Sequence, residues 1–197
     1  MVTVSLGFIF NSSYGNGYRL TGNEHYKQVL IDAGSSLITR FNPTVGSIKS
    51  WDTDRGWQAK RGWEYPVIID NMMNLELLFE VSKITGDDTY KNVAVAHANT
   101  TLKNHFRDDN SSYHLVDYDP ETGKVRSKQT AQGYSDDSSW ARGQAWGLYG
   151  FTVCYRYTQD ANYLEQAEKI AKYIIENPNI PSDGIPYWDY NAPNTSN

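Results

Sequence analysis

An acidic residue, Asp70, is placed between two apolar runs in residues 66–75 (PVIIDNMMNL). Two interpretations of this position remain open. The first is a carboxylate at a helix start, where the helix dipole favours negative charge by ~0.3–1 kcal/mol. The second is a partly desolvated carboxyl whose pKa is raised, so that it donates a proton near neutral pH. The apolar neighbours Ile68, Ile69, Met72 and Met73 favour desolvation.

The densest polar and aromatic stretch is residues 130–146 (TAQGYSDDSSWARGQAW). Residues 136–139 (DDSS) are predicted to cap a helix over residues 138–157, and its first two turns carry Trp140, Arg142 and Trp146. An arginine buried among aromatic rings needs an anion. We expect Arg142 to meet either an acidic residue of this segment, Asp136 or Asp137, or a negatively charged substrate.

The histidines and the cysteine exclude several site classes. His114 is next to Tyr113, and a lone histidine is more often structural than catalytic. The other three histidines lie in helical contexts without metal-ligand spacing, so we predict no metal site. The single cysteine, Cys154, excludes an internal disulfide and is expected to be a buried apolar residue. No phosphate-binding loop or nucleophile elbow occurs.

A repeated pattern predicts the scaffold. Residues 21–26 (TGNEHY), 85–90 (TGDDTY) and 158–163 (TQDANY) are each followed by about four turns of helical apolar spacing. Their Asp or Asn residues are plausible N-caps. Helices over 67–84 and 138–157 precede two of these loops. Helix, short turn and helix at similar intervals indicate stacked helical hairpins.

Two long loops, residues 42–66 and 107–137, favour a closed ring with a cleft at one end over an open solenoid. Within the second loop, residues 113–118 and 124–128 are predicted to form a β-hairpin. The fold class is therefore all-α, an (α/α)6 toroid. With about five or six helices of the twelve required, residues 1–197 form a single, partial toroid domain, and we expect the natural protein to be longer.

Composition limits the partners. The chain has 197 residues, a net charge of −5 and no Lys/Arg cluster, which argues against nucleic acid. No apolar run is long enough for a membrane span, and no signal peptide is evident. The sequence leaves the oligomeric state and the compartment open, although a cytoplasmic or periplasmic bacterial setting is expected. Six Trp and 15 Tyr suit both interhelical packing and sugar binding.

Three motifs, residues 69–74 (IDNMMN), 138–146 (SSWARGQAW) and 185–189 (IPYWD), together resemble glycoside hydrolase family 88, the unsaturated glucuronyl hydrolases. The resemblance implies an (α/α)6 barrel that acts on oligosaccharides ending in a 4,5-unsaturated uronic acid, the products of polysaccharide lyases. The reaction is hydration of the vinyl ether, without metal or organic cofactor. The resemblance also implies residue roles, namely Asp70 as the acid/base, His114 and Gln132 as water-holding residues, and Trp51, Trp140, Arg142 and Trp146 as substrate-binding residues.

The sequence departs from this family at residues 4–8 (VSLGF), where Ser5 replaces a carboxylate that the family uses. Either the chain is impaired or its first residues are not native. Three alternatives remain, which are a family 105 hydrolase of unsaturated rhamnogalacturonan, a non-catalytic or degenerate carbohydrate-binding toroid, and, more weakly, a toroidal sugar epimerase. A substrate panel separates the two hydrolases, whereas sugar binding without turnover would indicate the non-catalytic form.

Overall fold

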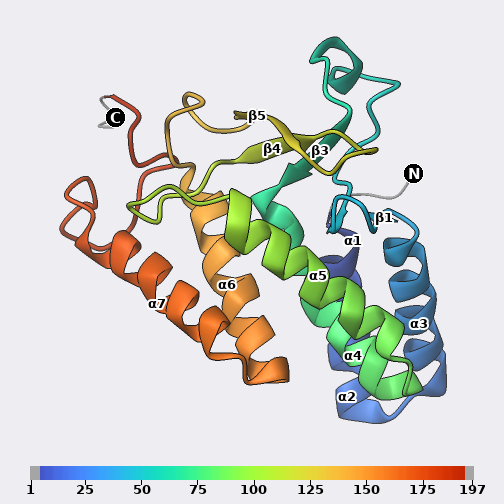
Figure 1. Cartoon of the computed structure of the whole chain (residues 1–197). Helices are drawn as coiled ribbons and strands as arrows, with labels where there is room; N and C mark the ends of the chain where they lie inside the picture. Colours follow the sequence, from blue (N-terminus) through green and yellow to red (C-terminus); the bar gives the residue numbers. More distant parts are fainter. Residues whose placement is uncertain (1–4, 194–197) are drawn as a thin grey trace.

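Helices form one end of the molecule and a small sheet lies at the other (Figure 1). The computed structural model describes residues 5–193. The helices are α1 (Leu6–Phe10), α2 (Asn16–Thr21), α3 (Glu24–Ile38), α4 (Leu75–Thr85), α5 (Asp88–Asn104), α6 (Ala141–Thr158) and α7 (Ala161–Glu176), with a π-helical turn η1 (Asn11–Gly15) and 3-10 turns η2 (Gln58–Lys60) and η3 (Ile69–Asn74). The strands are β1 (Phe41–Asn42), β2 (Ser47–Ile48), β3 (Tyr65–Ile68), β4 (Leu115–Tyr118) and β5 (Val125–Gln129).

The predicted hairpin turns and N-caps are confirmed. Asn23, Asp87 and Asp160 are the N-caps of α3, α5 and α7, and each side chain accepts a hydrogen bond from the backbone N–H two residues later. Such a cap contributes about 1 kcal/mol. Gly22 and Gly86 end α2 and α4 in the left-handed conformation. These local signals make the helices pack as pairs, α4 with α5 and α6 with α7.

The predicted helix start at Val67 is wrong. Residues 65–68 form strand β3, a 3-10 turn follows over residues 69–74, and the α-helix begins only at Leu75. The β-branched run of Val67, Ile68 and Ile69 suits a strand. Its pairing with β4, in which Ile68 lies opposite Leu115, fixes it as one. Asp70 therefore lies in the first turn of η3, directly after a strand.

The β-hairpin expected within residues 113–130 is confirmed by antiparallel pairing of β4 and β5. The sequence did not predict that β3 would extend it to a three-stranded sheet in the order β3-β4-β5. Because β3 ends the first long loop and β4 and β5 lie in the second, this sheet joins the two loops. Figure 1 shows both at the same end of the helices, as the ring model predicted.

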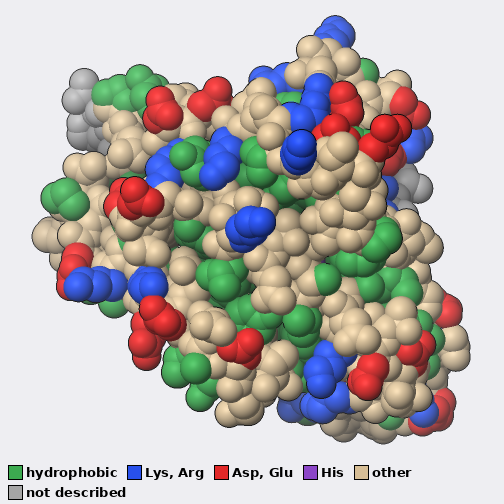
Figure 2. Space-filling model, viewed as in Figure 1, with side chains coloured by type: hydrophobic (Ala, Val, Ile, Leu, Met, Phe, Trp, Pro, Cys, Tyr) green, Lys and Arg blue, Asp and Glu red, His purple; other side chains and the backbone are tan. Residues whose placement is uncertain are grey.

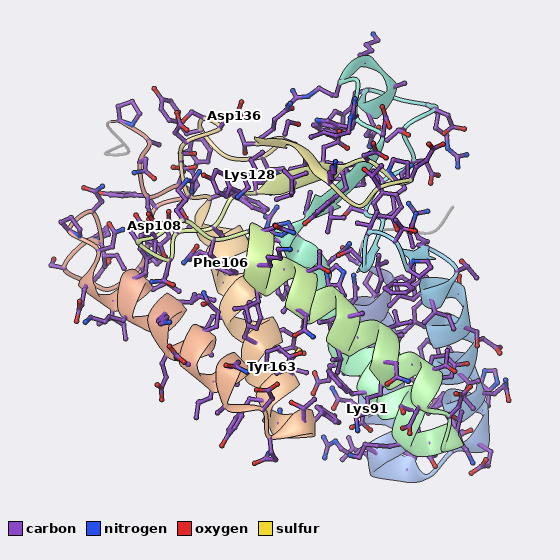
Figure 3. All side chains as sticks on the ribbon, viewed as in Figure 1. Lys91, Phe106, Asp108, Lys128, Asp136 and Tyr163 are labelled. Atoms are coloured by element: carbon purple, nitrogen blue, oxygen red, sulfur yellow. The ribbon has the colours of Figure 1, made fainter. Side chains whose placement is uncertain are left out.

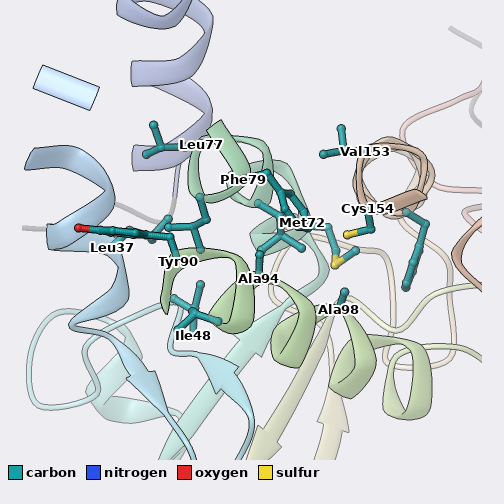
Figure 4. Close-up of a cluster of buried hydrophobic side chains, with 14 of the residues drawn as sticks. Leu37, Ile48, Met72, Leu77, Phe79, Tyr90, Ala94, Ala98, Val153 and Cys154 are labelled. Carbon is teal, nitrogen blue, oxygen red and sulfur yellow. The ribbon is translucent and has the colours of Figure 1, made fainter. Parts of the chain in front are cut away.

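The main core lies between the helices. Met72, Phe79, Ala94, Ala98 and Cys154 are among its buried residues, drawn in Figure 4. Cys154 is fully buried and its pKa is raised by desolvation, as expected of a structural thiol. Within residues 5–193, no helix has the length and apolar character that crossing a membrane requires.

Candidate active site

The predicted site residues gather where η3 and α6 begin, next to the sheet. The backbone N–H of Ile69 donates to the carbonyl of His114 at 2.9 Å, so the start of η3 is fixed to the start of β4. Asn71 Nδ2 donates to the carbonyl of Ile48 at 2.7 Å and fixes the same turn to β2. Asp70 lies between Ile69 and Asn71 in the sequence. The pairing of β3 with β4 and these two hydrogen bonds therefore set its position.

Asp70 is almost completely buried, with 5% of its surface exposed. Desolvation raises the pKa of its carboxyl from 3.8 to about 6, against the opposing effects of its own backbone N–H and of the Arg142 charge. Among the described residues, Oδ2 has no hydrogen-bond partner although it is buried. A buried, unpaired carboxyl oxygen is costly in a folded protein and points to a site that a ligand completes. The desolvated-carboxyl interpretation is therefore supported by the geometry.

His114 is neutral, and its neighbours select one tautomer. Its Nδ1 accepts a hydrogen bond from the Ala131 backbone N–H at 3.0 Å, so the ring proton is on Nε2. Nε2 lies 3.1 Å from Gln132 Oε1, to which it donates, and 3.7 Å from Asp70 Oδ2. Burial lowers the pKa of His114 to about 4. The contact with Asp70 is therefore not a salt bridge, because the ring carries no charge and the distance exceeds a hydrogen bond.

We expect His114 to remain the Nε2–H tautomer from pH 5.5 to pH 8. Nitrogen-15 NMR of the imidazole should show one protonated and one unprotonated nitrogen across this range, because burial and the Ala131 bond disfavour the imidazolium. The His114→Gln variant assigns the signal by its loss. Two protonated ring nitrogens at pH 6 would contradict this description.

Aromatic rings surround the imidazole. The ring centroid of His114 lies 5.0 Å from Trp140 and 6.2 Å from Trp51. The Arg142 guanidinium lies 4.3 Å from the centre of the Trp140 ring, in cation–π geometry. Asp70, His114, Gln132, Trp51, Trp140 and Arg142 thus form one cluster, which we call the acid–imidazole cluster.

The expected burial of Arg142, its pairing with Asp136 or Asp137, and the expected helix cap at residues 136–139 are wrong, whereas the alternative of an anionic substrate for Arg142 stays a prediction. Arg142 is exposed, and among the ion pairs within residues 5–193 none joins it to Asp136 or Asp137. Stacking on Trp140 holds the guanidinium instead. Residues 136–139 do not cap α6: its N-cap is Trp140, without a side-chain cap, and the Ala141 N–H donates to the Trp188 carbonyl. Asp136, labelled in Figure 3, instead accepts from the Thr130 backbone N–H.

Trp146 lies one turn beyond Arg142 on α6 and contacts the N-terminal helix. Its ring centroid is 5.0 Å from Phe8, and the Phe8 N–H donates to Asn74 Oδ1 at 3.2 Å. Helix α1 therefore packs on η3, which carries Asp70. Ser5, at the N-cap of α1, makes no side-chain capping bond. The residues before Ser5 lie outside the described part of the chain.

Sequence reasoning missed three positions that shape this site. Trp57 and Trp63 pack against Trp51 with ring centroids 5.3 and 5.7 Å apart. Gly150 brings α6 into contact with η3, since an added Cβ would lie 2.4 Å from Met72 Cβ. The dense tryptophan spacing in residues 51–63 was an available signal for the first two. Nothing local in the sequence indicates the role of Gly150.

No group of three or more His, Cys, Asp or Glu side chains within residues 5–193 is arranged to hold a metal ion. Lys and Arg side chains gather near the sheet end of the face in Figure 2, with acidic side chains among them. The cluster itself brings together a carboxyl whose pKa is raised to about 6, a neutral imidazole and a guanidinium.

The chain is similar in sequence and in structure to proteins of known function. The chain is 51% identical over 195 residues to an unsaturated glucuronyl hydrolase of Formosa agariphila, covering 98% of this chain and 48% of that protein. It is similar to the crystal structure of an unsaturated glucuronyl hydrolase specific for heparin, with a TM-score of 0.90, 47% identity and coverage of 96% and 49%. A mutant of the Streptococcus agalactiae enzyme in complex with dGlcA-GalNAc6S has a TM-score of 0.73 and 33% identity, with coverage of 96% and 43%.

The predicted fold class is confirmed, because these structural neighbours are α/α toroids. The chain spans about half the length of the relatives it matches. The Glycosyl Hydrolase Family 88 model matches residues 9–157, which include η3, the sheet and almost all of α6. On this match, and with the acid–imidazole cluster lying within it, the chain belongs to glycosyl hydrolase family 88.

Proposed function

We propose that the protein carrying this chain hydrates the C4–C5 double bond of a terminal unsaturated uronic acid and thereby releases the next sugar. The observation that carries the proposal is the buried, unpartnered Oδ2 of Asp70, whose pKa is raised to about 6. A carboxyl of this kind is neutral in a useful fraction of molecules near neutral pH, so it can protonate carbon C4. The names of the relatives support the substrate class.

The reaction balances without a cofactor. Asp70 gives its proton to C4, and positive charge develops on C5 and the ring oxygen, which the new carboxylate stabilises. Water then adds to C5 and returns a proton to Asp70. The resulting hemiketal opens, and the sugar attached at C1 is released. A well-placed general acid contributes ~10²- to 10⁴-fold to the rate of such a step.

The Nε2–H tautomer of His114 limits this residue to donating a hydrogen bond from Nε2. Since Nδ1 accepts from Ala131, the ring proton on Nε2 is the one that faces Gln132 Oε1, at 3.1 Å, and Asp70 Oδ2, at 3.7 Å. We propose that, in the substrate complex, a water molecule shares the hydrogen bond that Nε2–H now donates to Gln132 Oε1, and that Gln132 orients this water toward C5. His114 is then a donor that positions water and does not act as a base, because its pKa of about 4 keeps it neutral.

Substrate binding is assigned to the arginine and the aromatic residues. We propose that Arg142, which is exposed and stacked on Trp140 near the start of α6, pairs with the uronate carboxylate. The rings of Trp51 and Trp140 flank the imidazole. Trp146 lies one turn after Arg142 on α6, and its ring contacts Phe8. Sugar C–H faces pack against such rings. We propose glycosaminoglycan-derived disaccharides as substrates, as the names of the relatives suggest.

The test is turnover by the full-length protein. Incubation with unsaturated chondroitin and heparin disaccharides should remove the ultraviolet absorbance of the vinyl ether. The value of kcat/KM should fall as the pH rises above about 6, because the free enzyme must hold a proton on Asp70. An unsaturated rhamnogalacturonan disaccharide is the comparison substrate.

Sugar binding without turnover would contradict the proposal and favour the non-catalytic alternative that Ser5 raised. The matched variant Ser5→Asp then shows whether the missing carboxylate is the cause. A preference for the rhamnogalacturonan product would contradict the proposed substrate class.

A further inference from the structure

Residues 52–62 form a loop that leaves the end of β2 and projects above the sheet in Figure 1, with η2 at its tip. Trp57 lies in this loop and is 49% exposed although two other indoles contact it. Its ring centroid is 5.3 Å from Trp51 and 5.8 Å from Trp63. Trp51 and Trp63 stack on each other at 26°, whereas Trp57 stands at 66° and 80° to them. Indole surface on Trp57 therefore remains free for a ligand.

Contacts on both arms tether this loop. At its start, Asp52 accepts from Arg40 Nη1 at 2.9 Å. At its end, Arg61 Nη2 donates to the Thr130 carbonyl at 2.7 Å, and its guanidinium lies 4.8 Å from the Trp63 ring centre. Just beyond the loop, Trp63 Nε1 donates to a side chain of β5, Gln129, at 2.9 Å. A half-exposed indole on a tethered loop is preorganised for binding, since little conformational freedom remains to be lost.

The position of Trp57 relative to the acid–imidazole cluster indicates its occupant. His114, Trp51 and Trp57 form a continuous row, with centroid separations of 6.2 and 5.3 Å. The row leads from the buried carboxyl to the exposed end of the loop. An oligosaccharide whose terminal uronate lies beside Asp70 and His114 must extend its remaining sugars toward solvent, and Trp57 is the exposed ring on that row.

We propose that Trp57 is the stacking platform for the sugar attached to the unsaturated uronate, and so a determinant of specificity for oligosaccharides over simple glycosides. This inference rests on the proposed function. The indole supplies a flat apolar surface for the C–H face of a pyranose. It touches none of the reacting atoms, so its effect falls on binding of the leaving sugar.

The experiment compares Trp57→Ala and Trp57→Phe with wild type in the full-length protein. The substrates are an unsaturated disaccharide and the methyl glycoside of the same unsaturated uronate, which lacks a second ring. For Trp57→Ala we expect KM for the disaccharide to rise about three- to tenfold with kcat nearly unchanged, as for loss of one aromatic contact. The methyl glycoside should be turned over as by wild type. Trp57→Phe should retain most of the affinity.

A second measurement separates this inference from the proposed function. Calorimetry measures the affinity of the disaccharide for Asp70→Asn and for the double variant that also carries Trp57→Ala. Because Asp70→Asn does not turn the disaccharide over, the difference in affinity reports the contribution of Trp57 to binding. Wild-type turnover with an unchanged KM in Trp57→Ala overturns the inference alone. If wild type does not turn over the disaccharide, but the double variant binds it more weakly than Asp70→Asn does, only the proposed function is overturned. An equal loss on both glycosides, or disaccharide binding that does not depend on Trp57, overturns the inference.

Discussion

Replacing Asp70 with Asn should slow turnover by several orders of magnitude and should remove a stability cost that the wild-type carboxylate carries above about pH 6. We expect kcat to fall by ~10²- to 10⁴-fold, because an amide cannot donate the proton that C4 requires. The same change removes a buried carboxyl whose pKa is raised to about 6 from 3.8. Steady-state kinetics and urea unfolding of the full-length protein measure the two effects.

The sign of the stability effect follows from linkage. The folded state holds the Asp70 proton more tightly than the unfolded state, so the free energy of unfolding falls as pH rises through about 4 to 6. Above that range the carboxylate costs about 3 kcal/mol. The advantage of Asp70→Asn over wild type should therefore grow with pH and then level off, whatever constant cost the buried amide brings.

Asp52→Asn is the matched control with the opposite sign. Hydrogen bonds from Arg40 and Arg55 lower the pKa of Asp52 below its usual value. Its contribution to stability is present above the unfolded pKa and is lost as pH falls, so Asp52→Asn should be less stable than wild type at neutral pH. A stability difference for Asp70→Asn that does not change with pH would show that Asp70 is not the desolvated acid described here.

Replacing Gly150 with Ala should destabilise the protein and damage the site. The added Cβ would lie 2.4 Å from Met72 Cβ and 2.9 Å from the Met72 carbonyl oxygen. Because one of these atoms is backbone, α6 and η3 must separate. We expect a loss of about 1–3 kcal/mol in the free energy of unfolding, as for overpacked cores. Met72 is two residues after Asp70, so the shift also misplaces the acid, and misplacement of about 1 Å can cost ~10²-fold in rate.

Thr152→Ala provides the control for this prediction, since residue 152 is exposed on the same helix. It should change the free energy of unfolding by about 0.5 kcal/mol or less. Helix propensity alone would make Gly150→Ala stabilising by about 1 kcal/mol. A more stable Gly150→Ala variant with normal kcat/KM would therefore disprove close packing of α6 on η3.

The helical hairpins could be predicted from the sequence, because their signals are local. Each turn contains its own N-cap, such as Asn23, Asp87 or Asp160, and the first two also contain the left-handed glycine that ends the previous helix. The sequence also indicated the family resemblance, because the short motifs around Asp70 and Arg142 are contiguous in the chain. The comparisons then confirmed both the family and the toroid class.

The start of η3, the exposure of Arg142 and the tautomer of His114 depend on tertiary contacts and could not be predicted from the sequence. The segment before Asp70 is a strand because β4 lies beside it, and β4 is about fifty residues away in the chain. Arg142 is exposed and stacks on Trp140, whereas the sequence predicted a buried guanidinium paired with Asp136, Asp137 or a charged substrate. The Ala131 N–H fixes the imidazole tautomer, and burial sets the pKa values of both Asp70 and His114. Hydrogen-bond partners and desolvation depend on residues distant in sequence, so no local pattern encodes them.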